Sequence, residues 1–511
     1  MDLVAVGALE GNRMRYEHTI VINPPNPSGY VSNKDSMGGF GQLFHQGAPP
    51  APALDLPYLV AHVRGCGLPV EVVEAGAHEL SPAELCTRIN AIPDADIALV
   101  AVRTSLPTID WDLDVCAEVR RKCDVGAIVL IGPVIQSLLK RIEQDPSIDY
   151  AILGEPDYPV VELMRGDPLE QIQGLIYKNE AGSWQKTPER PFERDLDALH
   201  FPAWDLFPVD KYSIPRSSNA GKMRFLPMLT SRGCPYGCNY CPYPVGQGLR
   251  WRYRSAENVV DEMEWLVNQL GVEYILFRDP MFSLLQKRVV AICEEIKRRN
   301  IRVKWRCETR VDCLDEKTIV AMATAGCAGI NFGVESTDPE IQKGVERHVI
   351  TPDTVRDTLE TCKKHGIETF AFFIVGLPGD NVKTILDSIE FAVEIQAGWI
   401  QFTVSTPFIG TKLHRFAVEH GLIDKDFYKI ISSHEGSVGN ENLNAAQIHS
   451  LHVFAQFIAR NLLNRRGILK NANVKNPAYR SAKWAADLTS RSVANLLLRI
   501  ARWYFPRIVG A

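Results

Sequence analysis

Short apolar runs alternate with stretches of helical periodicity along most of this chain, in two separate series. Runs of about four to eight apolar residues between turn-forming residues are typical of buried strands. Strands that alternate with helices form parallel sheets covered on both faces. The first series predicts strands at residues 19–23, 70–73, 97–102, 127–131 and 150–153, with helices at 56–64 and 111–122. The chain is therefore expected to be an α/β protein.

The second series contains six strand–helix units. Strands are predicted at residues 225–230, 274–277, 303–307, 329–332, 369–375 and 400–404, and helices at 256–270, 286–298, 352–365 and 381–396. Six units favour an open or partial (β/α)6 barrel over a closed barrel of eight strands.

Composition suggests where the domains end. Residues 166–222 are rich in Pro, Asp and Gly with weak periodicity, as expected of a linker. We predict a Rossmann-like parallel-sheet domain at 1–165, a linker at 166–222, the partial barrel at 223–425 and a helical region at 426–511 with a basic amphipathic tail.

Charge is distributed unevenly along the 511 residues. Residues 456–511 hold eleven Lys or Arg and one acid, a net charge of +10, which leaves −15 for residues 1–455. An acidic body disfavours nucleic acid as a partner. Twelve cysteines are too few for a disulfide scaffold, and we find neither a signal peptide nor a stretch of about 18 apolar residues. We therefore expect a reducing, cytoplasmic location.

The tail at 493–509 leaves two interpretations open. Its apolar residues, Trp503 and Tyr504 among them, are interspersed with Arg499, Arg502 and Arg507, a pattern suited to a membrane interface and to a membrane-peripheral protein. The same pattern also suits a helix that docks on the barrel with its arginines in water. A glycine-rich stretch at 38–41 fits no phosphate-loop pattern, and we expect a flexible loop there.

Three closely spaced cysteines follow the first strand of the second series. Cys234, Cys238 and Cys241 lie in a loop with Gly233 and Gly237, whose backbones can fold around a bound group. Soft thiolates at such spacing select iron–sulfur clusters or zinc. A structural zinc needs a fourth ligand, and the next cysteine lies far along the chain in a helical pattern. The spacing therefore favours a [4Fe-4S] cluster with one open iron.

This Cys-x3-Cys-x2-Cys loop resembles that of the radical S-adenosylmethionine (SAM) superfamily. The resemblance implies that the open iron chelates SAM and that the reduced cluster cleaves it to methionine and a 5′-deoxyadenosyl radical. It also implies SAM contacts at the predicted strand ends. These are Tyr240 near the adenine, Asp279 at the amino group, Glu308 and Arg310 facing the site, Glu335 at the ribose or amino group, and the turn with Gly376 and Pro378 along the adenine.

Residues 18–465 further resemble the cobalamin-binding enzymes of that superfamily. Ligands of parallel sheets bind outside the carboxyl ends of the strands. The resemblance accordingly implies cobalamin contacts at Pro25, Asn26, Thr104, Ser105, Gly132, Val134, Gly154 and Glu155. The Asp-x-His-x-x-Gly motif, whose His ligates cobalt in many corrinoid proteins, is missing from the sequence. We expect a base-off corrinoid with an apolar residue below cobalt.

The resemblance implies a methyltransferase that moves a methyl group from SAM, through methylcobalamin, to an unactivated carbon of a small-molecule or lipid-like biosynthetic substrate. An electron donor such as flavodoxin or ferredoxin is implied as a partner, under anaerobic conditions. Two alternatives stay open: a cobalamin-dependent oxidative cyclase or rearrangement enzyme that transfers no methyl group, and a non-enzymatic sensor that binds an iron–sulfur cluster and a corrinoid.

Overall fold

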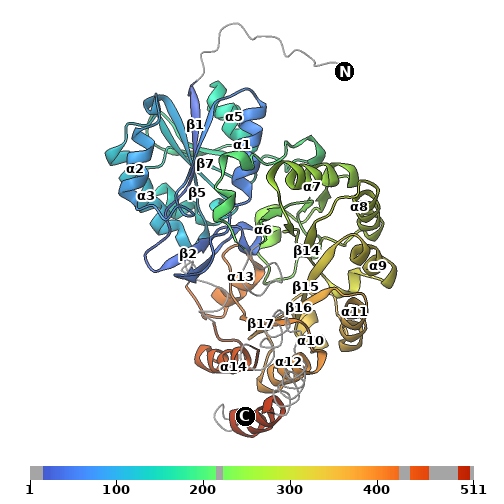
Figure 1. Ribbon diagram of the computed structural model, residues 1–511. Helices are drawn as coiled ribbons and strands as arrows, with labels where there is room; N and C mark the ends of the chain where they lie inside the picture. The colour runs from blue at the N-terminus through green and yellow to red at the C-terminus, as the bar shows by residue number, and fades with distance from the viewer. Residues whose placement is uncertain (1–14, 214–222, 425–437, 460–492, 507–511) are drawn as a thin grey trace. The chain divides into compact units, whose positions relative to one another are not determined.

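The computed structural model describes residues 15–213, 223–424, 438–459 and 493–506 of the chain. The chain forms two compact units. Unit 1 comprises Met1–Glu193 and Ala198–Lys211, and unit 2 comprises Arg194–Asp197 and Tyr212–Ala511. Each unit contains one large, mainly parallel sheet with helices, which confirms the predicted α/β fold (Figure 1).

Unit 1 is built on a seven-stranded sheet in the order β4-β1-β5-β6-β7-β8-β9. Its five parallel strands are β1 (His18–Asn23), β4 (Val70–Glu74), β5 (Ala98–Arg103), β6 (Ala127–Ile131) and β7 (Tyr150–Ile152). Every residue of β1, β5 and β6 is buried. Strands covered on both faces need continuous apolar runs, which is why these strands were visible in the sequence.

Helices cover both faces of this sheet. The helices α1 (Asp55–Gly65) and α5 (Asp157–Arg165) contact each other, as do α2 (Pro82–Asn90) and α3 (Ile109–Lys122), and the two pairs lie on opposite faces (Figure 1). The start of α2 is fixed by a capping box in which Ser81 and Glu84 bond to each other's backbone N–H groups. Helices on both faces leave the strand ends as the natural place for ligands.

Two further strands lie within the range in which we expected only a linker. The strands β8 (Leu175–Lys178) and β9 (Trp184–Lys186) pair antiparallel beyond β7 and extend the sheet. The Trp184 indole donates to the Glu143 carbonyl oxygen at 2.8 Å, which ties the edge strand to the body of the unit. The Pro- and Gly-rich composition of this range reflects its tight turns, and strands this short leave no periodicity to detect.

A small hairpin covers part of the carboxyl edge of the sheet. Its strands β2 (Tyr30–Asn33) and β3 (Gln42–His45) flank the glycine-rich stretch, and residues 38–41 are buried. The expectation of a flexible loop was therefore wrong. The glycines serve close packing instead: a Cβ atom on Gly39 (φ +90°) would lie 2.5 Å from Cγ of Pro133.

A buried ion pair fastens the hairpin to α3. The Lys34 ammonium donates to both carboxylate oxygens of Asp112, at 3.0 and 2.9 Å, and to the Arg103 carbonyl oxygen at 2.6 Å. Lys34 and Asp112 are 2% and 0% exposed, so neither charge is solvated. Burial lowers the pKa of Lys34 while Asp112 opposes that shift. The position of the hairpin therefore depends on the pair staying intact.

Unit 2 carries a six-stranded parallel sheet whose spatial order follows the chain. Its strands are β10 (Phe225–Met228), β13 (Tyr274–Phe277), β14 (Lys304–Thr309), β15 (Cys327–Glu335), β16 (Glu368–Val375) and β17 (Trp399–Val404). The helices between them are α7 (Ala256–Leu270), α8 (Gln286–Arg298), α9 (Glu316–Thr324), α11 (Pro352–Lys364) and α12 (Val382–Ile395), arranged along the outside of the curved sheet (Figure 1). This is the predicted partial (β/α)6 barrel.

Side chains on β15, β16 and β17 alternate between buried and half-buried. Because successive side chains of a strand point to opposite faces, one face packs on the helices and the other stays partly accessible. Asn331, Phe372 and Thr403 lie on the accessible face. The sheet therefore offers an inner surface on which a substrate can lie.

Helices follow the last strand. Among the described residues these are α13 (Lys412–Glu419), α14 (Ala445–Ile458), which packs on β16 and β17, and a helical stretch at 493–506. Within the described part of the chain, no helix has both the length and the apolarity needed to cross a membrane.

The ion pair under the hairpin gives a stability prediction. Asp112→Asn leaves the Lys34 ammonium buried without an anion, which should destabilise unit 1 by about 3–5 kcal/mol. Urea denaturation would show this as a lower midpoint of the transition in which unit 1 unfolds. The double variant Lys34→Met/Asp112→Leu, which removes both charges, should recover most of the loss. An unchanged midpoint in Asp112→Asn would contradict a structural role for the pair.

Candidate functional site

The cysteine loop of unit 2 begins at a residue that is held by three elements. Thr230 donates from its backbone N–H to Oδ1 of Asp279 at 2.7 Å, and its hydroxyl donates to Oδ2. Its carbonyl oxygen accepts from Nη2 of Arg288 at 2.8 Å and from the backbone N–H of Arg254 at 3.0 Å. Burial raises the pKa of Asp279, whereas Arg288 and Thr230 favour the ionised form. Asp279, which the resemblance assigned to SAM, thus has both carboxylate oxygens bonded to Thr230.

The loop itself is clasped by the segment that follows it. The backbone N–H of Gly233 donates to Oε1 of Gln247 at 3.1 Å, and that of Cys234 to the Gly248 carbonyl oxygen at 3.2 Å. These partners end α6 (Tyr243–Gln247), which leads to β12 (Arg252–Tyr253) paired with β11 (Ser231–Arg232). A Cβ atom on Gly233 (φ +83°) would lie 2.3 Å from the Arg250 carbonyl oxygen, so only glycine fits there.

The three cysteines of the loop are free thiols close to one another. Burial raises the pKa of Cys234 and Cys241, and the proximity of Cys238 adds to the increase. The thiolate forms therefore need positive charge nearby, which bound iron supplies. The donor chemistry of the loop fits an iron–sulfur cluster. Among the described residues, no group of three or more His, Cys, Asp or Glu side chains surrounds one point as the ligands of a single metal ion would.

A second group lies at the end of β15. Arg347, which follows the short helix α10 (Pro339–Gly344), donates from Nη2 to the Gly333 carbonyl oxygen at 2.5 Å and from Nη1 to the Tyr240 hydroxyl at 3.3 Å. Its Nη1 lies 3.7 Å from Oε1 of Glu335. Nε of Arg347 is buried without a hydrogen-bond partner in the described structure. Arg347 was not predicted, because it follows a helix end in a loop where no strand or motif marks it.

Glu335 combines backbone strain with a buried charge. Its φ of +67° places it in the left-handed region, at an irregularity in the pairing of β15 with β16. Burial raises the pKa of its carboxyl group, while Arg347 and Arg310 oppose the shift. A strained residue at a strand end beside two arginines is typical of a site that binds a charged ligand.

The remaining predicted SAM residues fall into two further groups. The Arg310 guanidinium lies 4.4 Å from the Tyr236 ring centroid and pairs with Asp312 at 2.8 Å. Oε1 of Glu308 accepts from Nη1 of Arg278 at 2.6 Å and from Nδ2 of Asn331 at 3.3 Å. Glu308 therefore belongs to a polar patch on the inner face of β13 to β15.

The turn after β16 lies next to Tyr240. The backbone N–H groups of Gly376 and Leu377 donate to Oδ2 of Asp380, both at 3.0 Å, which fixes the turn that contains Pro378. Leu377 packs in a cluster that includes Tyr240. The structure thus places Tyr240 next to both Glu335 and this turn, and the contact of these residues with SAM stays a prediction.

In unit 1, the predicted cobalamin residues lie at the carboxyl ends of β1, β5, β6 and β7. Pro25, Thr104, Ser105, Gly132 and Val134 are buried, whereas Asn26, Gly154 and Glu155 are half-buried. The Thr104 hydroxyl is fully buried and has no hydrogen-bond partner among the described residues. A Cβ atom on Gly132 (φ +140°) would lie 2.6 Å from the Thr104 carbonyl oxygen. An orphaned hydroxyl beside a close backbone turn fits a polar ligand at this edge.

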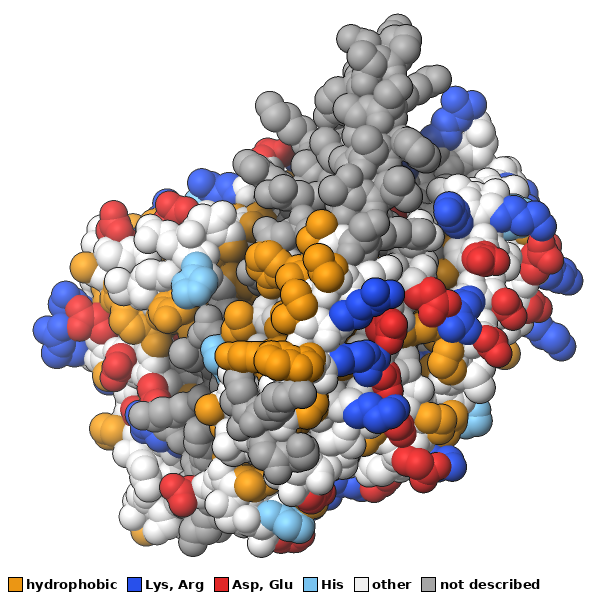
Figure 2. Space-filling model, turned by 90° about the horizontal axis from the view of Figure 1, so that it is seen from below, with side chains coloured by type: hydrophobic (Ala, Val, Ile, Leu, Met, Phe, Trp, Pro, Cys, Tyr) orange, Lys and Arg blue, Asp and Glu red, His pale blue; other side chains and the backbone are white. Residues whose placement is uncertain are grey.

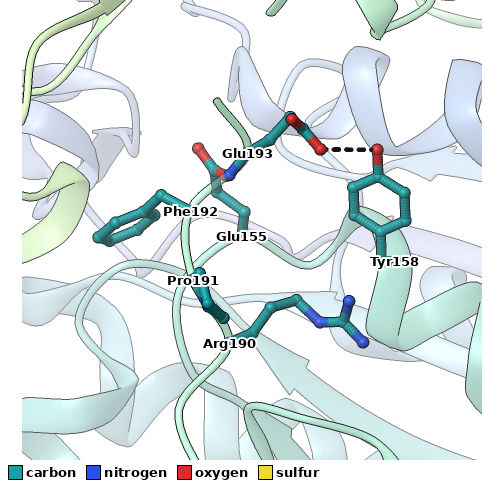
Figure 3. A pocket seen from close by; sticks show the side chains of 6 residues that line it. All are labelled: Glu155, Tyr158, Arg190, Pro191, Phe192 and Glu193. Atoms are coloured by element: carbon teal, nitrogen blue, oxygen red, sulfur yellow. Dashed lines mark hydrogen bonds between the residues drawn. The ribbon is translucent and has the colours of Figure 1, made fainter. Parts of the chain in front are cut away.

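A pocket of about 230 Å³ opens beside Glu155 (Figure 3). It is lined by Glu155, Tyr158, Arg190, Pro191, Phe192 and Glu193. The Tyr158 hydroxyl donates to Oε2 of Glu193 at 3.0 Å, and burial together with this bond raises the pKa of Tyr158 to about 12. The pocket therefore lies at the end of β7, next to Glu155, one of the half-buried residues predicted to contact cobalamin.

Comparison with known proteins decides the family. The profile of the radical SAM superfamily matches residues 228–392, which run from the last residue of β10 through the cysteine loop and β13 to β16 into α12. An uncharacterised methyltransferase of Pyrococcus horikoshii is 31% identical over 378 residues, which cover 73% of this chain and 80% of that protein. The chain belongs to the radical SAM superfamily. It is accordingly a radical SAM enzyme.

Two further similarities extend beyond the radical SAM unit. An anaerobic magnesium-protoporphyrin IX monomethyl ester cyclase of Rubrivivax gelatinosus is 24% identical over 367 residues, covering 69% of this chain and 63% of that protein. The radical SAM methyltransferase TsrM of Kitasatospora setae, solved with cobalamin and a [4Fe-4S] cluster, superposes with a TM-score of 0.63 at 21% identity over 79% of this chain and 75% of its own. This radical SAM enzyme therefore shares the fold of TsrM across both of its sheets.

The geometry of the cysteine loop predicts the effect of one methyl group. Gly233→Ala should abolish iron binding after anaerobic reconstitution, because the new Cβ atom collides with the Arg250 carbonyl oxygen. Iron and sulfide per chain are the measurement. Gly421→Ala is the matched control: its φ of +65° imposes the same backbone strain, but no atom lies within 4 Å of the Cβ position. Full iron content in Gly233→Ala would contradict the requirement for glycine at this position of the loop.

Proposed function

We propose that the protein is a cobalamin-dependent radical SAM methyltransferase that methylates an unactivated carbon of a small-molecule or lipid-like biosynthetic substrate. The observation that carries the proposal is the 31% identity to the Pyrococcus horikoshii methyltransferase over 73% of this chain. The fold shared with TsrM supports it, since both parallel sheets are present.

In this proposal Cys234, Cys238 and Cys241 hold the cluster. When bound, the cluster supplies the electron that cleaves SAM. The chain's own contribution is to hold the three thiols in one loop, anchored at Thr230 by Asp279 and clasped through Gly233. Asp279 in this scheme positions the loop, and the SAM amino group is left to Glu335.

We assign the SAM site to the group around Arg347. Arg347 and Arg310 flank Glu335 and provide the positive charge that a carboxylate needs, while the Glu335 carboxylate is suited to an ammonium group. Tyr240 and the turn with Gly376 and Pro378 form an apolar wall with backbone groups, which suits a purine. The methionine end of SAM would thus contact charged side chains, and the adenine end would contact the apolar wall.

We assign the corrinoid to the carboxyl edge of unit 1, at Pro25, Asn26, Thr104, Ser105, Gly132, Val134, Gly154 and Glu155. When bound, the corrinoid supplies the methyl group that reaches the substrate carbon. The orphaned Thr104 hydroxyl is available to a polar group of the ligand. Val134 is buried and apolar, which agrees with a corrinoid that has no protein ligand below cobalt.

The polar patch of Arg278, Glu308 and Asn331 is the part of unit 2 that we assign to substrate. It lies on the inner face of the sheet and presents charged and amide groups. A radical SAM enzyme also needs a reductant, for which a flavodoxin or ferredoxin is our candidate. Nucleic acid is not proposed as a partner, because the body of the chain is acidic.

The proposal is tested by anaerobic reconstitution with iron, sulfide and hydroxocobalamin, followed by reduction with SAM labelled at its methyl group. Formation of 5′-deoxyadenosine together with label in the corrinoid fraction is the expected result. Deoxyadenosine with an unlabelled corrinoid would favour the cyclase alternative, which the similarity to the Rubrivivax gelatinosus enzyme supports. If neither product formed, the proposal would be overturned and the sensor alternative would remain.

Replacing Arg347 should weaken SAM binding. Arg347→Gln loses charge-assisted hydrogen bonds worth about 1.5–3 kcal/mol, so the dissociation constant for SAM should rise by roughly ten- to a hundredfold. Titration of the reconstituted enzyme with SAM, followed by electron paramagnetic resonance, measures this. Arg306→Gln is the control, since Arg306 is equally buried but stacks on Phe370, 3.7 Å from its ring centroid. Equal SAM affinity in both variants would refute the assignment.

A methyl group at Gly132 should reduce cobalamin uptake. Gly132→Ala places a Cβ atom 2.6 Å from both Nη1 of Arg103 and the Thr104 carbonyl oxygen, so the edge of the sheet must shift. Cobalamin bound per chain, read from its absorbance after gel filtration, should fall well below that of the unaltered enzyme. Gly182→Ala, in the turn between β8 and β9 with no atom within 4 Å, should bind cobalamin normally.

A further inference from the structure

The helix at 493–506 exposes a continuous apolar stripe. Val493, Leu496, Ile500, Trp503 and Tyr504 are 39%, 57%, 52%, 61% and 50% exposed. At about 100° per residue, these five positions fall on one side of the helix. An exposed apolar stripe of this size on a folded protein marks an interaction site.

The opposite side of the same helix is docked on unit 2. Ala494, Leu498 and Ala501 are buried. Nη2 of Arg502 pairs with Asp387 at 2.7 Å and with Glu390 at 2.5 Å, both on α12. The two interpretations of the tail are therefore compatible: one side of the helix packs on the barrel, and the other side remains apolar and exposed.

The neighbouring helix α14 adds to the exposed apolar surface. Phe454 of α14 lies 5.8 Å from Phe505, ring centroid to ring centroid, and Val453 and Phe457 of α14 are 52% and 49% exposed. Figure 2 shows hydrophobic side chains gathered on the face seen from below, with both basic (Lys, Arg) and acidic (Asp, Glu) side chains beside them. The two helices thus contact each other through Phe454 and Phe505, and each exposes apolar side chains of its own.

We propose that this stripe binds the surface of an anionic lipid bilayer. Apolar side chains on one side of a helix, with Trp and Tyr at the polar boundary, suit the interface between headgroups and acyl chains. The helix contains no acid, its Arg499 is exposed, and residues 456–511 carry a net charge of +10, which anionic headgroups complement.

Charge also argues against a second copy of the chain as the occupant. A symmetric pairing of the same face would bring Arg499 of one chain towards Arg499 of the other, together with two tails of like charge. Anionic lipid would neutralise these positive charges, whereas self-association would bring them closer together. The proposal concerns the surface to which the enzyme binds, and it does not depend on the proposed reaction or its substrate.

Vesicle flotation with the full-length protein tests the proposal. The protein should float with phosphatidylcholine vesicles that contain phosphatidylglycerol and bind phosphatidylcholine alone more weakly. Ile500→Glu and Trp503→Glu should each weaken binding by roughly tenfold or more, because an apolar side chain is lost and a negative charge gained. Asn495→Glu is the matched control: it adds the same charge at an exposed position of the same helix outside the stripe, and it should retain binding.

A second measurement separates a local contact from misfolding. Tryptophan emission should shift to the blue on addition of the anionic vesicles, and the shift should be lost in Trp503→Phe, which keeps an aromatic ring. Absence of flotation would overturn the proposal. So would equal binding by Ile500→Glu and the unaltered chain, or a dimer in solution that Ile500→Glu converts to a monomer.

Discussion

The bonds around Thr230 are the constraint on which the radical SAM unit depends. One residue uses its N–H, its hydroxyl and its carbonyl oxygen to join the ends of β10 and β13, the helix α8 and the segment after β12. Four residues later comes the first thiol of the loop. Flexible loops are poor supports for reactive groups, and a loop that must hold thiols in fixed positions needs such an anchor at its base. The role that we infer for Asp279, at the end of β13, is therefore to hold the base of the cysteine loop in place.

Most of the fold could be predicted because its strands are buried on both faces or on one. The runs at 98–103 and 127–131 are almost entirely apolar, and the three thiols are closely spaced in one loop directly after a strand. Features that depend on tertiary packing could not be predicted. Gly39 and Gly41 suggested flexibility but serve close packing, and β8 and β9 are too short to show a period. Arg347 lies in a loop, and only the folded chain brings it to Tyr240 and Glu335.

Unit 1 places charge where a purely structural sheet would have none. Lys34, Asp112 and Arg103 are all buried near the carboxyl edge, and Arg103 also pairs with Asp55 at 2.5 Å. Buried pairs contribute little net stability, since desolvation offsets most of their attraction. Their effect here is to fix the hairpin and the strand ends in one arrangement. An edge arranged in advance in this way loses less conformational freedom when a ligand binds.

The anchor of the cysteine loop also has a consequence for biosynthesis. Asp279 and Arg288 lie 49 and 58 residues after Thr230, so the ribosome makes the thiols well before it makes the groups that fix their loop. Because protein chains fold from the N-terminus during synthesis, the three thiols emerge on an unanchored segment. Cluster insertion into a finished loop must wait until α8 has emerged and packed. Cells that make this enzyme in air would expose these thiols to oxidation during that interval, before any iron protects them.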